Sequence, residues 1–179
     1  MADRFPGQIW FRVTKDFTGD INELVGLIVS AIEECDESSA REVGADVDKS
    51  IEVYTEDAVR EAIRKGMIFD CSKYEASYGQ LNVEDDFRKH KIPFDRHSDA
   101  KYDHCAEMTY YRPGYEQEYF LSDQGGSDVF VPVKKIRGLL DELDNVEPPA
   151  DYGQLADKLR DLLPTLPPLE HLETWEGEI

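Results

Sequence analysis

Hydrophobic and polar positions are most regularly ordered over residues 66–112. The apolar residues Met67, Ile68, Phe69 and Cys71 are typical of a strand, and apolar residues at helical spacing over 80–91 predict an amphipathic helix. Pro93 marks the return to an extended chain, and alternation over 105–111 predicts a further strand. The stretch therefore predicts a β-α-β-β unit in which a helix covers one face of a sheet.

The same periodicities predict the remaining elements. Strands are expected at 8–14, 51–54, 115–121 and 129–133, helices at 21–32, 55–65, 134–143 and 151–163, and a polar loop at 38–50. We expect an α+β fold with a mostly antiparallel sheet, helices packed on one face and a C-terminal helical appendage. Residues 1–133 would form the core domain, 134–165 helices packed on that core, and 166–179 a proline-rich acidic tail. Such a tail is expected to be extended and poorly ordered unless a partner or neighbouring surface holds it.

The charge of the chain narrows the classes of partner. Among 179 residues there are 39 Asp or Glu and 20 Lys or Arg, which gives a net charge of -19. Nucleic acids and anionic membranes repel such a surface, whereas basic proteins attract it. Three cysteines are too few for a disulfide framework, and no run resembles a signal peptide or a membrane span. We therefore expect a soluble cytoplasmic protein with reduced thiols.

The acids are spread unevenly along the chain. Residues 16–57 hold 13 acids and two bases, residues 102–179 hold 17 acids and six bases, and residues 58–101 hold eight acids and nine bases. One interpretation is a solubilising or salt-adapted surface, although salt adaptation would normally acidify the whole chain. The other is that carboxylates are displayed to the basic groove of a partner. The expected contact residues are Asp16, Asp20, Glu23, Glu33, Glu34, Asp36, Glu37, Glu42, Asp46, Asp48, Asp141, Glu142, Asp144 and Glu147.

The second interpretation predicts a mimic of nucleic acid. Duplex DNA carries a phosphate about every 3.4 Å along each strand, and carboxylates along a helix and its following loop would imitate such a row. The predicted function is a non-enzymatic inhibitor of a basic nucleic-acid-binding protein or nuclease complex. It needs no cofactor and no direct contact with nucleic acid or membrane. The leucine-rich last two helices would also allow pairing into a homodimer.

Metal-ligating side chains gather in the polar segment 95–105 and indicate a different function. Imidazole, carboxylate and thiolate groups all bind transition metals, and the candidate ligands are His97, Asp99, Asp103, His104 and Cys105. Their spacing matches no established metal motif. Acids at Asp70, Glu75 and 84–86 would supply a paired-carboxylate site by the same reasoning. A metal-dependent hydrolase is therefore an alternative, and surface loop residues between two strands are the simpler interpretation.

Aromatic residues cluster at Tyr110, Tyr111, Tyr115, Tyr119 and Phe120. In an antiparallel sheet, such residues typically form cross-strand pairs in the core. An exposed part of the cluster would instead suit a protein-binding patch, because tyrosine is favoured at interface hot spots. An accessory protein–protein interaction module without mimicry is therefore a second alternative.

Two short motifs resemble a group of known proteins. They are IPFDR at 92–96 and YYRPG at 110–114, and they are similar to segments of small uncharacterised acidic proteins carried by phages and plasmids. The resemblance covers a minor part of the chain and implies an origin in a mobile element. Small acidic proteins of such elements are often anti-defence factors of the anti-restriction or anti-CRISPR type, and some of these mimic nucleic acid.

Overall fold

The computed structural model describes residues 4–45, 49–77, 79–100, 105–116, 118–122, 129–130, 136, 138–139, 157–158 and 166–177. Within these residues one eight-stranded antiparallel sheet runs in the spatial order β3-β2-β4-β1-β5-β6-β7-β8. The strands are β1 Arg4–Phe11, β2 Glu37–Arg41, β3 Ile51–Glu52, β4 Ile68–Ser77, β5 Phe94–Ser98, β6 Glu107–Tyr111, β7 Glu118–Ser122 and β8 Val129–Phe130. The helices are α1 Ile21–Glu33, α2 Glu56–Arg64, α3 Glu84–Lys89 and the 3-10 helix η2 Leu169–His171. The predicted α+β class and antiparallel sheet are confirmed.

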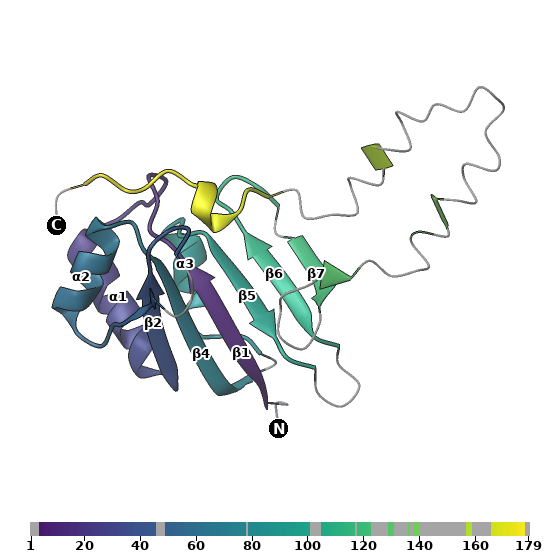
Figure 1. The fold of residues 1–179 in the computed structure, drawn as a ribbon, viewed down its shortest axis with the longest axis horizontal. Coiled ribbons are helices and arrows are strands. Elements are labelled where there is room, and N and C mark those ends of the chain that lie inside the picture. Colours follow the sequence, from purple (N-terminus) through teal and green to yellow (C-terminus); the bar gives the residue numbers. More distant parts are fainter. Residues whose placement is uncertain are drawn as a thin grey trace.

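Strand β1 lies near the centre of the sheet, between β4 and β5 (Figure 1). Its alternating residues separate two faces, because successive side chains of a strand point in opposite directions. Ile9 and Phe11 are buried in the cluster to which α1, α2 and α3 contribute. Gln8 and Trp10 therefore lie on the opposite side, which we call the open face. The three helices cover one face, as the sequence predicts.

The first two helices each begin after a side chain that caps the backbone. The Asp20 carboxylate accepts hydrogen bonds from the backbone N–H groups of Asn22 and Glu23 at 2.8 and 3.1 Å. Thr55 caps α2 through its hydroxyl, which accepts a hydrogen bond from the Ala58 N–H at 3.3 Å. These caps satisfy backbone donors that have no partner within the helix.

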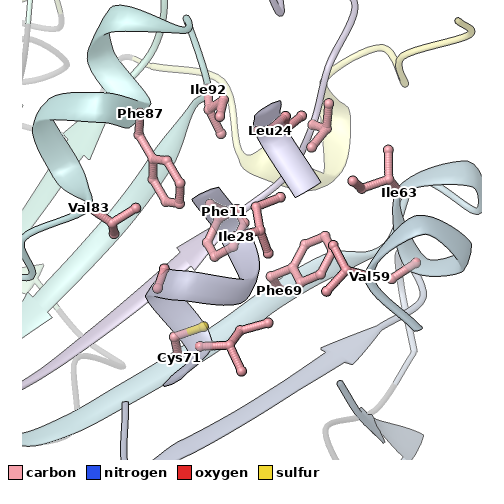
Figure 2. Close-up of a cluster of buried hydrophobic side chains, with 14 of the residues drawn as sticks. Phe11, Leu24, Ile28, Val59, Ile63, Phe69, Cys71, Val83, Phe87 and Ile92 are labelled. Carbon is pink, nitrogen blue, oxygen red and sulfur yellow. The ribbon is translucent and has the colours of Figure 1, made fainter. Parts of the chain in front are cut away.

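Aromatic side chains form the centre of the core (Figure 2). The rings of Phe11 and Phe69 stack with centroids 4.9 Å apart, and Phe87 of α3 lies 4.5 Å from Phe11. Ile28 of α1 and Ile63 of α2 close the cluster from the helical layer. Each of these side chains stabilises the fold by roughly 1.5–3 kcal/mol through burial.

Several predicted elements differ in their bounds: the strand predicted at 8–14 is β1 at 4–11, the strand predicted at 67–71 is β4 and extends to residue 77, and two elements differ more in kind. The predicted polar loop at 38–50 begins instead with β2, because the small side chains of Ser38 and Ala40 are buried while the strand pairs with β4. The predicted helix at 80–91 is limited to α3. There the Glu84 carboxylate accepts a hydrogen bond from the Leu81 N–H at 3.0 Å, which holds the residues before α3 in a turn. The helices predicted at 134–143 and 151–163 lie almost entirely outside the described residues.

The core holds the proline-rich tail along one end of the sheet, where it is drawn in yellow in Figure 1. The buried guanidinium of Arg12 donates hydrogen bonds to the carbonyl oxygens of Leu169 at 3.3 Å and Leu172 at 2.9 Å. It also donates to the Thr174 hydroxyl at 2.5 Å. Trp175 then packs edge-on against Phe17, with ring centroids 6.2 Å apart. The condition for an ordered tail, a neighbouring surface that holds it, is therefore met over 166–177.

A second buried arginine anchors the start of this segment. Arg112 donates from Nε to the Pro167 carbonyl at 2.7 Å and from Nη1 to the Asp95 carboxylate at 2.6 Å. Its side chain is among the largest that are fully buried in the described residues. Arg12 and Arg112 thus supply buried hydrogen-bond donors to backbone carbonyl groups of the tail.

Candidate binding surface

Polar side chains occupy the open face where β4, β1 and β5 run side by side. The register places Gln8 beside Ser72, and Trp10 between Asp70 and Asp95. Their neighbours along each strand point to the helices, so these side chains share one face. Residues far apart in the sequence are thereby brought together by strand pairing.

Asp70 is held in a fixed position on this face by two side-chain donors. It accepts hydrogen bonds from Gln8 Nε2 at 2.8 Å and from the Trp10 indole N–H at 3.0 Å. Burial raises the pKa of Asp70 above its ordinary value, and these two hydrogen bonds oppose the shift. The Arg41 guanidinium also acts to lower this pKa, but it forms its own ion pair with Glu170 of the tail at 3.3 Å.

A hollow of about 540 Å³ opens beside Asp70. Its lining combines three carboxylates with hydroxyl and amide groups: Gln8, Glu37, Ser38, Ser39, Ser50, Glu52, Tyr54, Asp70 and Ser72. The volume falls within the range of small-ligand pockets, whose walls are usually more apolar. None of these lining residues is Lys or Arg. The chemistry therefore suits a hydrophilic cationic group, such as the guanidinium or ammonium of a basic side chain.

Four carboxylates lie where α1 gives way to β2, and we call this segment, Glu33, Glu34, Asp36 and Glu37, the acidic junction. All four are exposed. Tyr74 of β4 orders part of the junction: its backbone N–H donates to Asp36 at 2.7 Å and its hydroxyl to Glu37 at 2.5 Å. Glu37 also lines the hollow, so the junction and the hollow form one acidic region.

Glu34 forms an ion pair with a lysine of β4. Its carboxylate lies 3.8 Å from Lys73 Nζ and accepts a hydrogen bond from Asn82 Nδ2 at 2.9 Å. At half exposure such an ion pair contributes little to stability. The junction therefore keeps most of its charge available to solvent or to a partner.

The other predicted contact residues divide into three groups. Asp20 serves as the cap of α1, and hydrogen bonds from the Glu23 and Asn22 N–H groups lower its pKa. Asp16, Glu23 and Glu42 are exposed. The remainder lie outside the described residues: Asp46, Asp48, Asp141, Glu142, Asp144 and Glu147.

The predicted metal-binding segment is only partly a loop. Residues up to Ser98 belong to β5, so the interpretation of the whole segment as a surface loop is wrong, and Asp95 is held by Arg112. His97 Nδ1 and Asp99 Oδ1 are 3.7 Å apart, and both line a smaller hollow of about 200 Å³. Cys105 is exposed, whereas Asp103 and His104 are not among the described residues. In the described part of the chain, no three His, Cys, Asp or Glu side chains are placed to hold a metal ion.

The predicted aromatic cluster is split between the two faces. Tyr110 and Phe120 form an edge-on pair with centroids 5.9 Å apart. Tyr111 points the other way, packs 5.2 Å from the Phe94 ring and donates its hydroxyl to the Arg88 carbonyl. Tyr115 and Tyr119 are exposed by 62% and 59%. Only these two tyrosines offer a large exposed surface among the five residues.

Sequence reasoning missed the grouping of Asp70 with Gln8 and Trp10. The one local signal is Trp10 itself, a large side chain on the opposite face from Ile9 and Phe11. An indole N–H on a half-covered face requires an acceptor, but the sequence does not name it.

Comparison with known proteins identifies no relative: no family model, no curated protein and no solved structure matches the chain. None of the helices in the described ranges is long and apolar enough to cross a membrane.

Proposed function

We propose that the protein is a non-enzymatic inhibitor that binds a basic nucleic-acid-binding protein through its acidic region. The observation that carries the proposal is the continuity of the acidic junction with the hollow through Glu37. A row of exposed carboxylates attracts a basic groove over a distance. The hollow then receives one basic side chain of that groove, whose charge Asp70 and Glu52 balance. Mimicry of a nucleic-acid backbone is the form of this proposal that the motif resemblance favours.

A charge-neutralising variant tests the role of the junction. Glu33→Gln/Glu34→Gln/Glu37→Gln keeps the size of each side chain and leaves acceptors for Asn82 and Tyr74. Binding would be measured against a panel of purified restriction endonucleases and guide-RNA nucleases over a salt series, together with inhibition of DNA cleavage. The wild type is expected to bind tightly at low salt, and its affinity is expected to fall steeply as salt is added. The affinity of the variant is expected to be at least about tenfold lower than that of the wild type.

A matched control separates local recognition from overall charge. Asp57→Asn/Glu75→Gln/Asp85→Asn removes three exposed acids elsewhere on the described surface. The control loses the same overall charge as the junction variant, so its association is expected to slow slightly. Its affinity is expected to stay within about twofold of that of the wild type. If the two variants lose affinity equally, the acidic residues serve solubility and not local recognition. Binding that does not depend on salt would also contradict the proposal.

Exposed tyrosines support the second candidate, an interaction module that does not depend on acids. Tyr115 and Tyr119 are more than half exposed, and tyrosine is enriched at interface hot spots. If Tyr115→Ala/Tyr119→Ala abolishes binding to the same panel while the junction variant retains it, this candidate replaces the inhibitor.

A further inference from the structure

Two thiols meet beside the acidic junction. Cys35 follows α1, and Cys71 points from β4 into the core below α1 (Figure 2). Cys71 belongs to the buried cluster and Cys35 packs against it, and each thiol is the largest influence on the pKa of the other. The adjoining backbones are also joined, because the Asp36 N–H donates to the Ser72 carbonyl at 2.8 Å. This backbone hydrogen bond holds the segment that follows α1 against β4, next to Cys71.

The two thiols differ in their readiness to react. Cys35 is partly exposed, and the hydrogen bond from Cys71 lowers its pKa, with the charge of Lys73 acting in the same direction. Cys71 is buried, and its pKa is raised, first by the hydrogen bond to Cys35 and then by burial. A thiolate is the nucleophile in disulfide exchange. Cys35 is thus the attacking thiol, and Cys71 is placed to react second.

We propose that Cys35 and Cys71 form a reversible disulfide when the protein meets a small-molecule disulfide such as oxidised glutathione. The Cys35 thiolate attacks one sulfur of glutathione disulfide, the glutathione S–S bond breaks, and glutathione thiolate leaves. The Cys71 sulfur then attacks Cys35 Sγ, the mixed disulfide breaks, and a second glutathione leaves. The two protons of the protein thiols end on two glutathione thiols, so two electrons pass from the protein to the oxidant.

The disulfide would tie the end of α1 to β4. Cys35 packs against the cluster that contains Cys71, and the backbones that flank the two residues are joined, so the bond is expected to form with little backbone movement. It encloses β2, β3 and α2 in one covalent loop. Because a cross-link across such a loop restricts the unfolded chain, oxidation is expected to raise the urea midpoint of the full-length protein.

Peptide mapping tests the proposal on the full-length protein. Reduced protein is incubated with glutathione disulfide, free thiols are blocked with iodoacetamide, and the chain is digested with trypsin. Cleavage after Lys15, Arg41, Lys65 and Lys73 leaves the two cysteines on peptides 16–41 and 66–73. The expected product is a monomer in which these two peptides are joined and which dithiothreitol separates. The urea midpoint of that monomer is expected to rise and to fall again on reduction.

The third cysteine supplies the matched control. Cys105 is exposed, so Cys105→Ser should leave the cross-link unchanged, whereas Cys35→Ser should abolish it and leave Cys71 reduced. Because the wild-type map alone identifies the bond, the test stands even if a variant at the buried Cys71 fails to fold. The proposal is overturned if Cys35 accumulates only as the glutathione adduct while Cys71 remains reduced. It is equally overturned if the joined peptides come from two chains.

Discussion

Arg96→Met should destabilise the fold by roughly 3 kcal/mol, because it leaves the carboxylate of Glu84 buried without its main counter-charge. The Arg96 and Glu84 side chains are 3% and 6% exposed, and Nε of the arginine lies 3.4 Å from Oε1 of the glutamate. Arg96 also donates to the Thr109 hydroxyl at 2.6 Å. Methionine fills a similar volume but offers neither charge nor donors.

The magnitude follows from what remains around Glu84. Removal of one partner from a buried ion pair costs about 3–5 kcal/mol. Arg88 stays 3.2 Å from Glu84 and is one-third exposed, so the lower end of that range applies. Replacing both Arg96 and Glu84 by methionine removes the uncompensated charge. It also leaves the Leu81 N–H, which donates to the Glu84 carboxylate in the wild type, without an acceptor. The double variant should therefore lose only about 1–2 kcal/mol and be more stable than Arg96→Met.

Urea unfolding followed by tryptophan fluorescence measures these differences. The control is Arg4→Met, because the Arg4–Glu75 pair is 65% and 73% exposed and its loss should cost no more than about 1 kcal/mol. Burial raises the pKa of Glu84, and the charge of Arg96 opposes that shift. Without Arg96 the folded state holds the proton more tightly, so the deficit of Arg96→Met should shrink as pH falls from about 7 to about 5. A loss below about 1 kcal/mol, or additive effects in the double variant, would refute the reasoning.

Three further outcomes follow from single sites. Burial raises the pKa of Asp70, so the contribution of Asp70 to stability falls as pH rises from its pKa in the unfolded chain to its pKa in the folded protein. The variant Asp70→Asn lacks this dependence. In urea titrations the stability of the variant relative to the wild type should therefore improve between about pH 4 and pH 7. Gly79 and Gly44 both have positive φ, of 68° and 75°, but a Cβ at Gly79 would lie 2.2 Å from Ser98 Cβ whereas Gly44 faces open space. In thermal melts Gly79→Ala should therefore cost at least about 1 kcal/mol more than Gly44→Ala. Leu169→Ala in the tail should cost about 2 kcal/mol and speed hydrogen exchange over 166–177, because this side chain is 3% exposed.

Local signals in the sequence were sufficient for α2. Thr55 supplies the cap, Val59, Ala62 and Ile63 form the buried stripe, and Gly66 ends the helix with a φ of 62°. Each of these signals acts within a few residues, so no distant contact is needed to find the helix. The alternation that separates Ile9 from Trp10 likewise follows from the strand period alone.

The features that the sequence did not predict, which are strand β2 and the side-chain contacts of the open face and the tail, depend on pairing between distant segments. β2 reads Glu-Ser-Ser-Ala-Arg, which carries no apolar alternation, and it is a strand because β4 supplies its hydrogen-bond partners. The contact of Asp70 with Trp10 joins residues 60 positions apart. Arg12 and Arg112 similarly find their acceptors in the tail, far along the chain. Hydrophobic periodicity contains no information about such partners, so the open face could not be assembled from the sequence.

The fold makes the surface more acidic than the composition suggests. Arg12, Arg96 and Arg112 are buried among the described residues, whereas Glu84 is the one carboxylate buried there to the same extent. Among the described residues, burial thus withdraws three cations and one anion, a net charge of +2, from the surface of a chain whose total charge is -19. Solubility of a small domain requires a net charge of only about 2–8, and a larger charge destabilises the compact state through self-repulsion. An acidic surface kept at this cost, while arginine serves as an internal hydrogen-bond donor, supports the proposal that the protein attracts a basic partner.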